Sequence, residues 1–139
     1  MRPRILSSSK SGLPGVEYRA RPLLVYARGV GDIGPHLTTN VEQYTQRIKM
    51  RDDVDAPRQV EHFANFLNIK DARTAARQLE ALGFAVEVTR RRILQATLVA
   101  RVVSTVDVET ADVMVEQVFG VCEANRGDYD GWGAPIVRE

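Results

Sequence analysis

Residues 84–103 read FAVEVTRRRILQATLVARVV, and this segment predicts two β-strands joined by a short connection. Its first six residues alternate between apolar and polar side chains, which is typical of a β-strand with one buried face. The arginines at positions 90–92 predict a short, exposed connection, and a second strand follows over residues 93–103. We therefore expect an antiparallel hairpin whose sheet is half open to solvent. The expected buried row of the second strand is Leu94, Ala96, Leu98, Ala100 and Val102, and its outward row is Gln95, Thr97, Val99 and Arg101.

A strand and an alanine-rich helix precede this hairpin. Residues 59–67 form the first expected strand. Asn68, with Asp71 three residues later, resembles a capping box and predicts the start of a helix. Gly83 stands where a helix commonly ends. The apolar stripe of this helix recurs every three or four residues and comprises Ala72, Ala75, Ala76, Leu79 and Leu82.

A second helix and a final strand follow the hairpin. Asp107 is the expected N-cap, and Gly127 is the expected stop of the helix. The last strand is predicted over residues 129–137. Because Pro135 has no backbone N–H, this strand must lie at a sheet edge or end there. The helix buries one stripe, namely Ala111, Met114, Val115, Val118 and Cys122.

The predicted order of elements is βαββαβ, with the core over residues 59–137. Right-handed crossovers fold such a chain into a four-stranded antiparallel sheet with both helices on one face. This is the ferredoxin-like α+β fold. The opposite face is left for a partner, for an N-terminal helix or for water.

The part of the chain before the core divides into an extension and one further helix. Residues 1–36 are expected to form a flexible extension, of which residues 1–22 lack periodicity and 23–27 could form a strand, while 37–139 form a single domain. A helix is predicted over residues 40–51. Gly29-Val30-Gly31-Asp32-Ile33-Gly34 matches the glycine pattern of dinucleotide sites, but Pro35 follows at once, so a flexible loop is expected. The predicted apolar stripe of the helix is Leu37, Val41, Tyr44 and Ile48.

Composition and charge constrain the environment and the partners. The single Cys122 excludes an internal disulfide and fits a reducing compartment, so a cytoplasmic location is expected. No apolar stretch is long enough to span a bilayer, and no membrane partner is expected. Residues 1–28 carry six Lys or Arg against one acidic residue, whereas residues 29–139 carry 13 basic and 17 acidic groups. An acidic body argues against broad binding to the phosphate backbone of nucleic acids.

The residues that most often carry catalysis do not form a constellation in this sequence. His36 and His62 lack the further ligands that a zinc site requires, so no metal and no cofactor are expected. Cys122 lies on the apolar stripe of a helix and is best interpreted as a small buried side chain. Glu61 and Glu87 belong to strands of a half-open sheet, where carboxylates usually face water. We therefore expect no enzymatic activity.

Three local strings resemble one family, the regulators of ribonuclease E activity B (RraB). They are Val60-Glu61-His62-Phe63 in the first strand, the alanine-rich helix that ends in 82–88 (LGFAVEV), and Tyr129-Asp130-Gly131-Trp132-Gly133 at the end. The last string is the most specific, and the similarity covers roughly residues 40–137. The resemblance implies a ferredoxin-like domain that binds ribonuclease E, or a related RNA-processing enzyme, and lowers its activity by contact. It implies no active site.

The candidate partner-binding residues lie in the first and last strings. Trp132 stands between two glycines, so another backbone can approach it closely, and aromatic anchors dominate interface energetics. The alternative for Trp132 is a packing role beneath a helix. Strict alternation places Tyr129 on the opposite face from Trp132. The candidates are Tyr129, Asp130, Trp132, His62 and Glu61.

A second function remains open, namely an RNA-binding or small-ligand-binding ferredoxin-like module. RNA-binding sheets of this type display aromatic and basic side chains on their central strands. The outward row of the second hairpin strand contains no aromatic residue, so only the arginines at 90–92 and the basic residues of 1–28 favour RNA.

Overall fold

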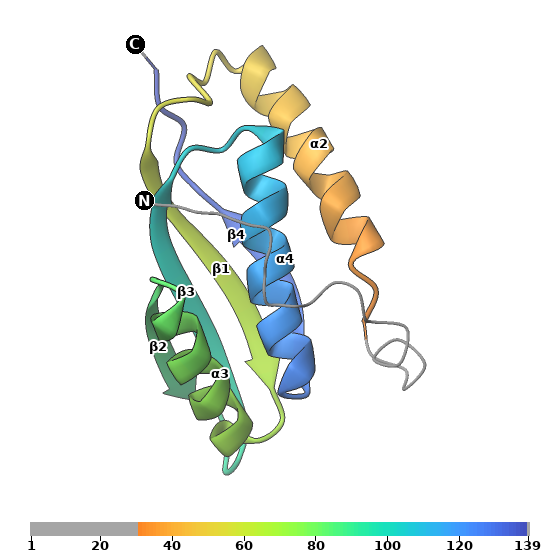
Figure 1. The fold of residues 1–139 in the computed structure, drawn as a ribbon, viewed down its shortest axis with the longest axis vertical. Helices are drawn as coiled ribbons and strands as arrows, with labels where there is room; N and C mark the ends of the chain where they lie inside the picture. Colours follow the sequence, from red (N-terminus) through yellow and green to blue (C-terminus); the bar gives the residue numbers. More distant parts are fainter. Residues whose placement is uncertain (1–30, 139) are drawn as a thin grey trace. The chain divides into compact units, whose positions relative to one another are not determined.

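The computed structural model describes residues 31–138, and within this range the fold is α+β (Figure 1). The described residues from Asp32 onward form one compact unit. The elements are α2 (Gly34–Lys49), β1 (Arg58–Phe66), α3 (Ile69–Ala81), β2 (Ala85–Arg90), β3 (Ala96–Ser104), α4 (Val108–Ala124) and β4 (Gly127–Gly133). In this part of the chain no helix is both long and apolar enough to cross a membrane.

The four strands form one antiparallel sheet in the order β2-β3-β1-β4. Helices α3 and α4 are the connections that cross over between parallel strands two places apart, and they cover the same face of the sheet (Figure 1). Helix α2 packs on α4, and so it too lies on the helical side. The predicted ferredoxin-like arrangement, with a helix before the first strand, is confirmed. The other face of the sheet stays uncovered by any described element.

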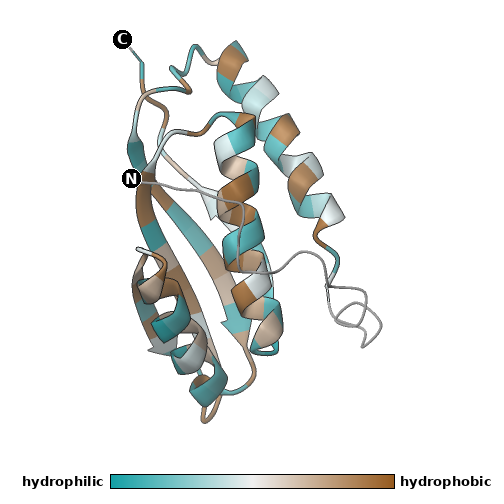
Figure 2. Ribbon diagram, in the orientation of Figure 1, coloured by the Kyte–Doolittle hydropathy of each residue, from teal (hydrophilic) through white to brown (hydrophobic). Residues whose placement is uncertain are grey.

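The two crossover helices begin at side-chain caps. The Asn68 side chain accepts a hydrogen bond from the Lys70 N–H at 2.8 Å, and Asp107 accepts one from the Thr110 N–H at 3.1 Å. Such caps satisfy backbone donors that the first helical turn leaves unpaired. Along α4, apolar residues alternate with polar ones, as expected of a helix with one buried stripe (Figure 2). Its buried residues include Ala111, Met114, Val115, Val118 and Cys122.

Helix α2 differs from its prediction in both its start and its buried face. The helix begins at Gly34 rather than Asn40, because Pro35 occupies the first turn, where a missing backbone N–H costs nothing. Gly34, the last glycine of the pattern, is therefore the first residue of the helix, whereas residues 29 and 30 lie outside the described residues. Val41 and Ile48, predicted to be buried, are 52% and 48% exposed.

A buried group of charges adds to the apolar contacts that Leu37 and Tyr44 of α2 make with the core. Asp52 has a fully buried carboxylate, which lies 2.8 Å from Arg47 and 2.7 Å from Arg58. Arg47 also donates to the carbonyls of Ala134 and Pro135. Burial alone would raise the pKa of Asp52, but the hydrogen bonds from the two guanidinium groups outweigh it and hold the pKa below its usual value. These contacts join α2, β1 and the segment after β4.

Candidate functional site

His62 and Tyr129 both lie in the core rather than on the surface. The two side chains are 0% and 3% exposed, and the Nδ1 atom of His62 lies 2.8 Å from the phenolic oxygen of Tyr129. The Nε2 atom of His62 has no hydrogen-bond partner within residues 31–138. Complete burial lowers the pKa of His62 to about 3, so the ring is neutral near pH 7. The pair joins β1 to β4 beneath the helices.

A β-bulge in β4 determines where Trp132 points. Phe63 pairs with Gly131 and the next residue, Ala64, pairs with Tyr129, so Asp130 is an extra residue in the edge strand. The prediction that Tyr129 and Trp132 lie on opposite faces is wrong, because one inserted residue reverses the alternation. Tyr129 is buried in the main core, and the half-buried ring of Trp132 packs against the same core.

Trp132 contacts α2 on its other side. Its indole N–H donates to the Asn40 side chain at 2.8 Å, and its carbonyl accepts from Gln43. The guanidinium of Arg47 lies 5.4 Å from the centre of the indole ring, within the range of a cation–π contact. Trp132 therefore fixes α2 against the end of β4, the packing role that the sequence left open beside the interface role.

Glu61 lies on the uncovered face, in an ion-pair group that crosses three strands. Arg101 on β3 donates to Glu61 on β1 at 2.7 Å and to Glu87 on β2 at 3.2 Å. The hydrogen bonds to these two carboxylates raise the pKa of Arg101. Glu61 and Glu87 thus share the guanidinium group of Arg101. This arrangement neutralises their charge and is not that of a general acid beside a general base.

The uncovered face also carries an aromatic residue that the sequence analysis missed. Phe63, on central strand β1, is 39% exposed and pairs with Val99 of β3. The alternation of the first strand contains this information, because Val60, His62 and Ala64 are buried on the other side.

Two carboxylates line the β4 side of the domain. Asp128 and Asp130 are exposed, and neither forms an ion pair within the described part of the chain. Together with the half-exposed Glu61 on the neighbouring strand they form what we call the acidic edge, namely Glu61, Asp128 and Asp130. This edge lies next to the bulge, where Gly131 and Gly133 leave the backbone without side chains.

Comparison with known families identifies the chain. The model of the RraB family, described as regulator of ribonuclease activity B, matches residues 42–134. The chain belongs to the RraB family. A search of curated proteins finds no match. The matched range includes the His62–Tyr129 pair, the bulge and the acidic edge, and it confirms the resemblance drawn from the three strings.

Two features of this RraB-family chain bear on a reactive site, namely its cysteine and the placement of its possible metal ligands. Burial raises the pKa of the Cys122 thiol to about 12, so this group is a thiol and not a nucleophilic thiolate near pH 7. Among residues 31–138, no group of three His, Cys, Asp or Glu side chains is placed to hold a metal ion. Family membership makes the chain a regulator of ribonuclease activity.

Proposed function

We propose that this protein regulates RNA decay or processing in the cytoplasm by binding ribonuclease E, or a related RNA-processing enzyme, without cutting RNA itself. Membership in a family of ribonuclease regulators supports the proposal. The unpaired thiol is compatible with a reducing compartment.

The observation that carries the proposal is the acidic edge. Asp128 and Asp130 present uncompensated charge beside an uncovered sheet face, and no described helix shields them. An enzyme surface that handles RNA is expected to be basic. Opposite charges on the two surfaces would speed the encounter and select the partner.

The five candidate residues divide into two roles under this proposal. Glu61 and Asp130 are accessible and would contact the partner. His62 and Tyr129 would hold β1 and β4 together from beneath, and Trp132 would fix the edge strand against α2. His62, Tyr129 and Trp132 would thus act by positioning the two accessible carboxylates.

A pull-down with purified ribonuclease E tests the proposal. We expect association at micromolar concentration, and we expect addition of the protein to change the rate of RNA cleavage by the enzyme. The double variant Asp128→Lys/Asp130→Lys should weaken association at least about tenfold, since reversing charges at a complementary interface replaces attraction by repulsion. The double variant Glu80→Lys/Glu109→Lys is the matched control, because both residues are exposed and belong to helices α3 and α4 rather than to the strands of the acidic edge.

Failure to associate at micromolar concentration would overturn the proposal. Equal weakening by the control would remove the acidic edge as the contact surface. RNA cleavage by the purified protein alone would contradict a non-catalytic role.

A further inference from the structure

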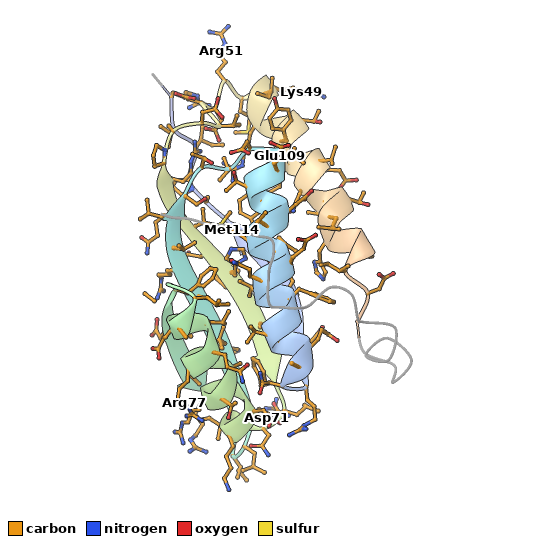
Figure 3. All side chains as sticks on the ribbon, viewed as in Figure 1. Lys49, Arg51, Asp71, Arg77, Glu109 and Met114 are labelled. Atoms are coloured by element: carbon orange, nitrogen blue, oxygen red, sulfur yellow. The ribbon has the colours of Figure 1, made fainter. Side chains whose placement is uncertain are left out.

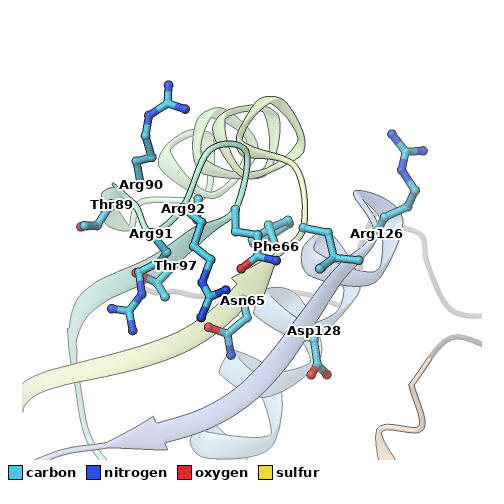
Figure 4. Close-up of a pocket in the computed structure, with 13 residues that line it drawn as sticks. Asn65, Phe66, Thr89, Arg90, Arg91, Arg92, Thr97, Arg126 and Asp128 are labelled. Carbon is cyan, nitrogen blue, oxygen red and sulfur yellow. The ribbon is translucent and has the colours of Figure 1, made fainter.

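One end of the uncovered sheet face is hollowed and basic. A hollow of about 860 Å³ lies where β1 ends and the β2–β3 hairpin turns (Figure 4). Four arginines line it against a single carboxylate, that of Asp128. The arginines are Arg90, Arg91, Arg92 and Arg126.

Two of these arginines have unengaged guanidinium groups. Arg90 donates to the carbonyl of Ile93, and Arg126 pairs with Asp71, and both point away from the hollow (Figure 4). Arg92 extends toward Asn65, and Arg91 lies near Thr97 (Figure 4). No hydrogen bond or ion pair engages the side chain of Arg91 or Arg92 anywhere in residues 31–138. Two free cations at one rim favour an anionic ligand with more than one charge.

The floor of the hollow offers neutral hydrogen-bonding groups that are also free. Asn65 of β1 pairs in register with Thr97 of β3, which pairs with Thr89 of β2. These side chains, and that of Gln95, form no hydrogen bond within the described range. Amide and hydroxyl groups of this kind can pair with the edges of nucleotide bases.

An aromatic ring continues the same row of the sheet. Phe63 precedes Asn65 by two residues on the same face, a separation of about 7 Å along a strand. Exposed aromatic rings on the central strands of ferredoxin-like sheets stack on unpaired bases. Arg101 is already neutralised by two carboxylates, so the basic contacts come from the hairpin.

We propose that this face binds single-stranded RNA, with phosphates at Arg91 and Arg92, base edges over the Asn65–Thr97–Thr89 row, and one base stacked on Phe63. Asp128 at the β4 side would repel phosphate and keep the strand over β1, β3 and β2. The function goes beyond regulation by protein contact. It uses the sheet face beside the acidic edge, and Asp128 is common to both sites because it also lines the hollow.

Two other polyanions are less well matched. An acidic peptide would use the arginines but not the row of free amides and hydroxyls or the aromatic ring. Leu67, Ile93 and Leu94 are 78%, 84% and 57% exposed at this end, which could also suit an anionic membrane surface. Membrane insertion at the hairpin tip would leave Phe63 unused, because that residue lies along the sheet away from the turn.

Fluorescence anisotropy with a labelled single-stranded RNA of about twelve nucleotides tests the proposal in the full chain. Arg91→Glu/Arg92→Glu should weaken binding at least about tenfold and reduce the slope of log affinity against log salt by about 1.4, since each lost phosphate contact contributes about 0.7. Phe63→Ala should weaken binding about tenfold, and Phe63→Tyr should preserve it. The control Lys49→Glu/Arg51→Glu makes the same charge change at the opposite end of the domain. Figure 3 shows Lys49 and Arg51 at one end and Arg77 and Asp71 at the other. Asp71 marks the end with the hollow, because it pairs with Arg126.

The basic residues of 1–28 are present in every variant, so any difference between variants belongs to the sheet. Equal RNA affinity in the hairpin variant and the control would overturn the proposal. So would displacement of RNA by polyglutamate at matched charge. Binding to phosphatidylglycerol vesicles that depends on Arg91 and Arg92, without RNA binding, would overturn it in favour of a membrane. None of these outcomes depends on association with ribonuclease E, so the two proposals fail independently.

Discussion

The Nδ1 atom of His62 lies 2.8 Å from the phenolic oxygen of Tyr129, and this contact joins two strands inside the core. Tyr129→Phe removes the hydroxyl and leaves a buried ring nitrogen unpaired. We expect the free energy of unfolding to fall by about 1–3 kcal/mol, which urea denaturation measures. His62→Leu should cost a similar amount, because it leaves the hydroxyl unpaired. In the double variant His62→Leu/Tyr129→Phe the two losses of unfolding free energy should not add, because neither substitution then leaves a buried polar group without its partner. Strict additivity would show that the contact contributes nothing.

The same histidine predicts a dependence of stability on pH. Burial lowers the pKa of His62 from 6.5 to about 3, so between these values the unfolded chain binds a proton that the folded chain does not. The stability that depends on the neutral ring is therefore fully present above pH 6.5 and is lost as the pH falls. Within this window the free energy of unfolding should drop by about 1.4 kcal/mol per pH unit on account of His62.

Urea denaturation between pH 7 and pH 5 measures this slope. The double variant without His62 is the control, because it retains every carboxylate. Parallel curves for the two proteins would contradict the assignment.

Asp52 is the anion that compensates two buried guanidinium groups. Asp52→Ala leaves Arg47 and Arg58 in the interior without a counter-charge, and we expect a loss of about 3–5 kcal/mol. Asp55→Ala, three residues away and exposed, should change stability by less than about 0.5 kcal/mol. Because Arg47 belongs to α2, the Asp52 variant should also speed hydrogen exchange throughout that helix. Unchanged exchange in α2 would show that other contacts hold it.

Three glycines of β4 should respond differently to alanine. Gly131 has φ of +118°, so Gly131→Ala should cost about 1–3 kcal/mol although its Cβ would meet open space. Gly133→Ala has neither a positive φ nor a close neighbour and should be nearly neutral. A Cβ at Gly127 would overlap the ring of Phe66, and this substitution should be the most harmful of the three. Thermal denaturation of the three variants gives the order, and a harmless Gly131→Ala would argue against the bulge geometry.

The sequence predicted the elements whose pattern reflects burial against a single layer. β1, α3 and α4 were placed within a few residues, because their apolar stripes and caps all indicate the same face. The hairpin was recognised, but β3 begins at Ala96 and not at Ile93, so Leu94 is exposed instead of buried. Three successive arginines cannot reveal where pairing begins, since the turn is set by backbone hydrogen bonds such as that from the Arg91 N–H to the Gln95 carbonyl.

The errors in α2 and β4 have a different origin. A prediction from periodicity assigns polar side chains to the surface. Asn40 and Arg47 are nevertheless buried, because they form hydrogen bonds with Trp132 and Asp52. Those partners lie on other segments and become neighbours only on folding. The bulge at Asp130 likewise depends on how β4 pairs with β1, and no local sequence pattern predicts it. The acidic edge adds Glu61 of β1 to two residues of β4, and the hollow adds Asn65 of β1 and Arg126 to the arginines of the hairpin, so both form only on folding.

The lone cysteine has a practical consequence. Cys122 is 0% exposed on α4, and its raised pKa keeps the sulfur protonated. A thiol-specific reagent can reach it only when α4 separates from the sheet. The labelling rate under native conditions therefore measures how often α4 opens. Because the chain contains one cysteine, every molecule that acquires a label has opened at this helix.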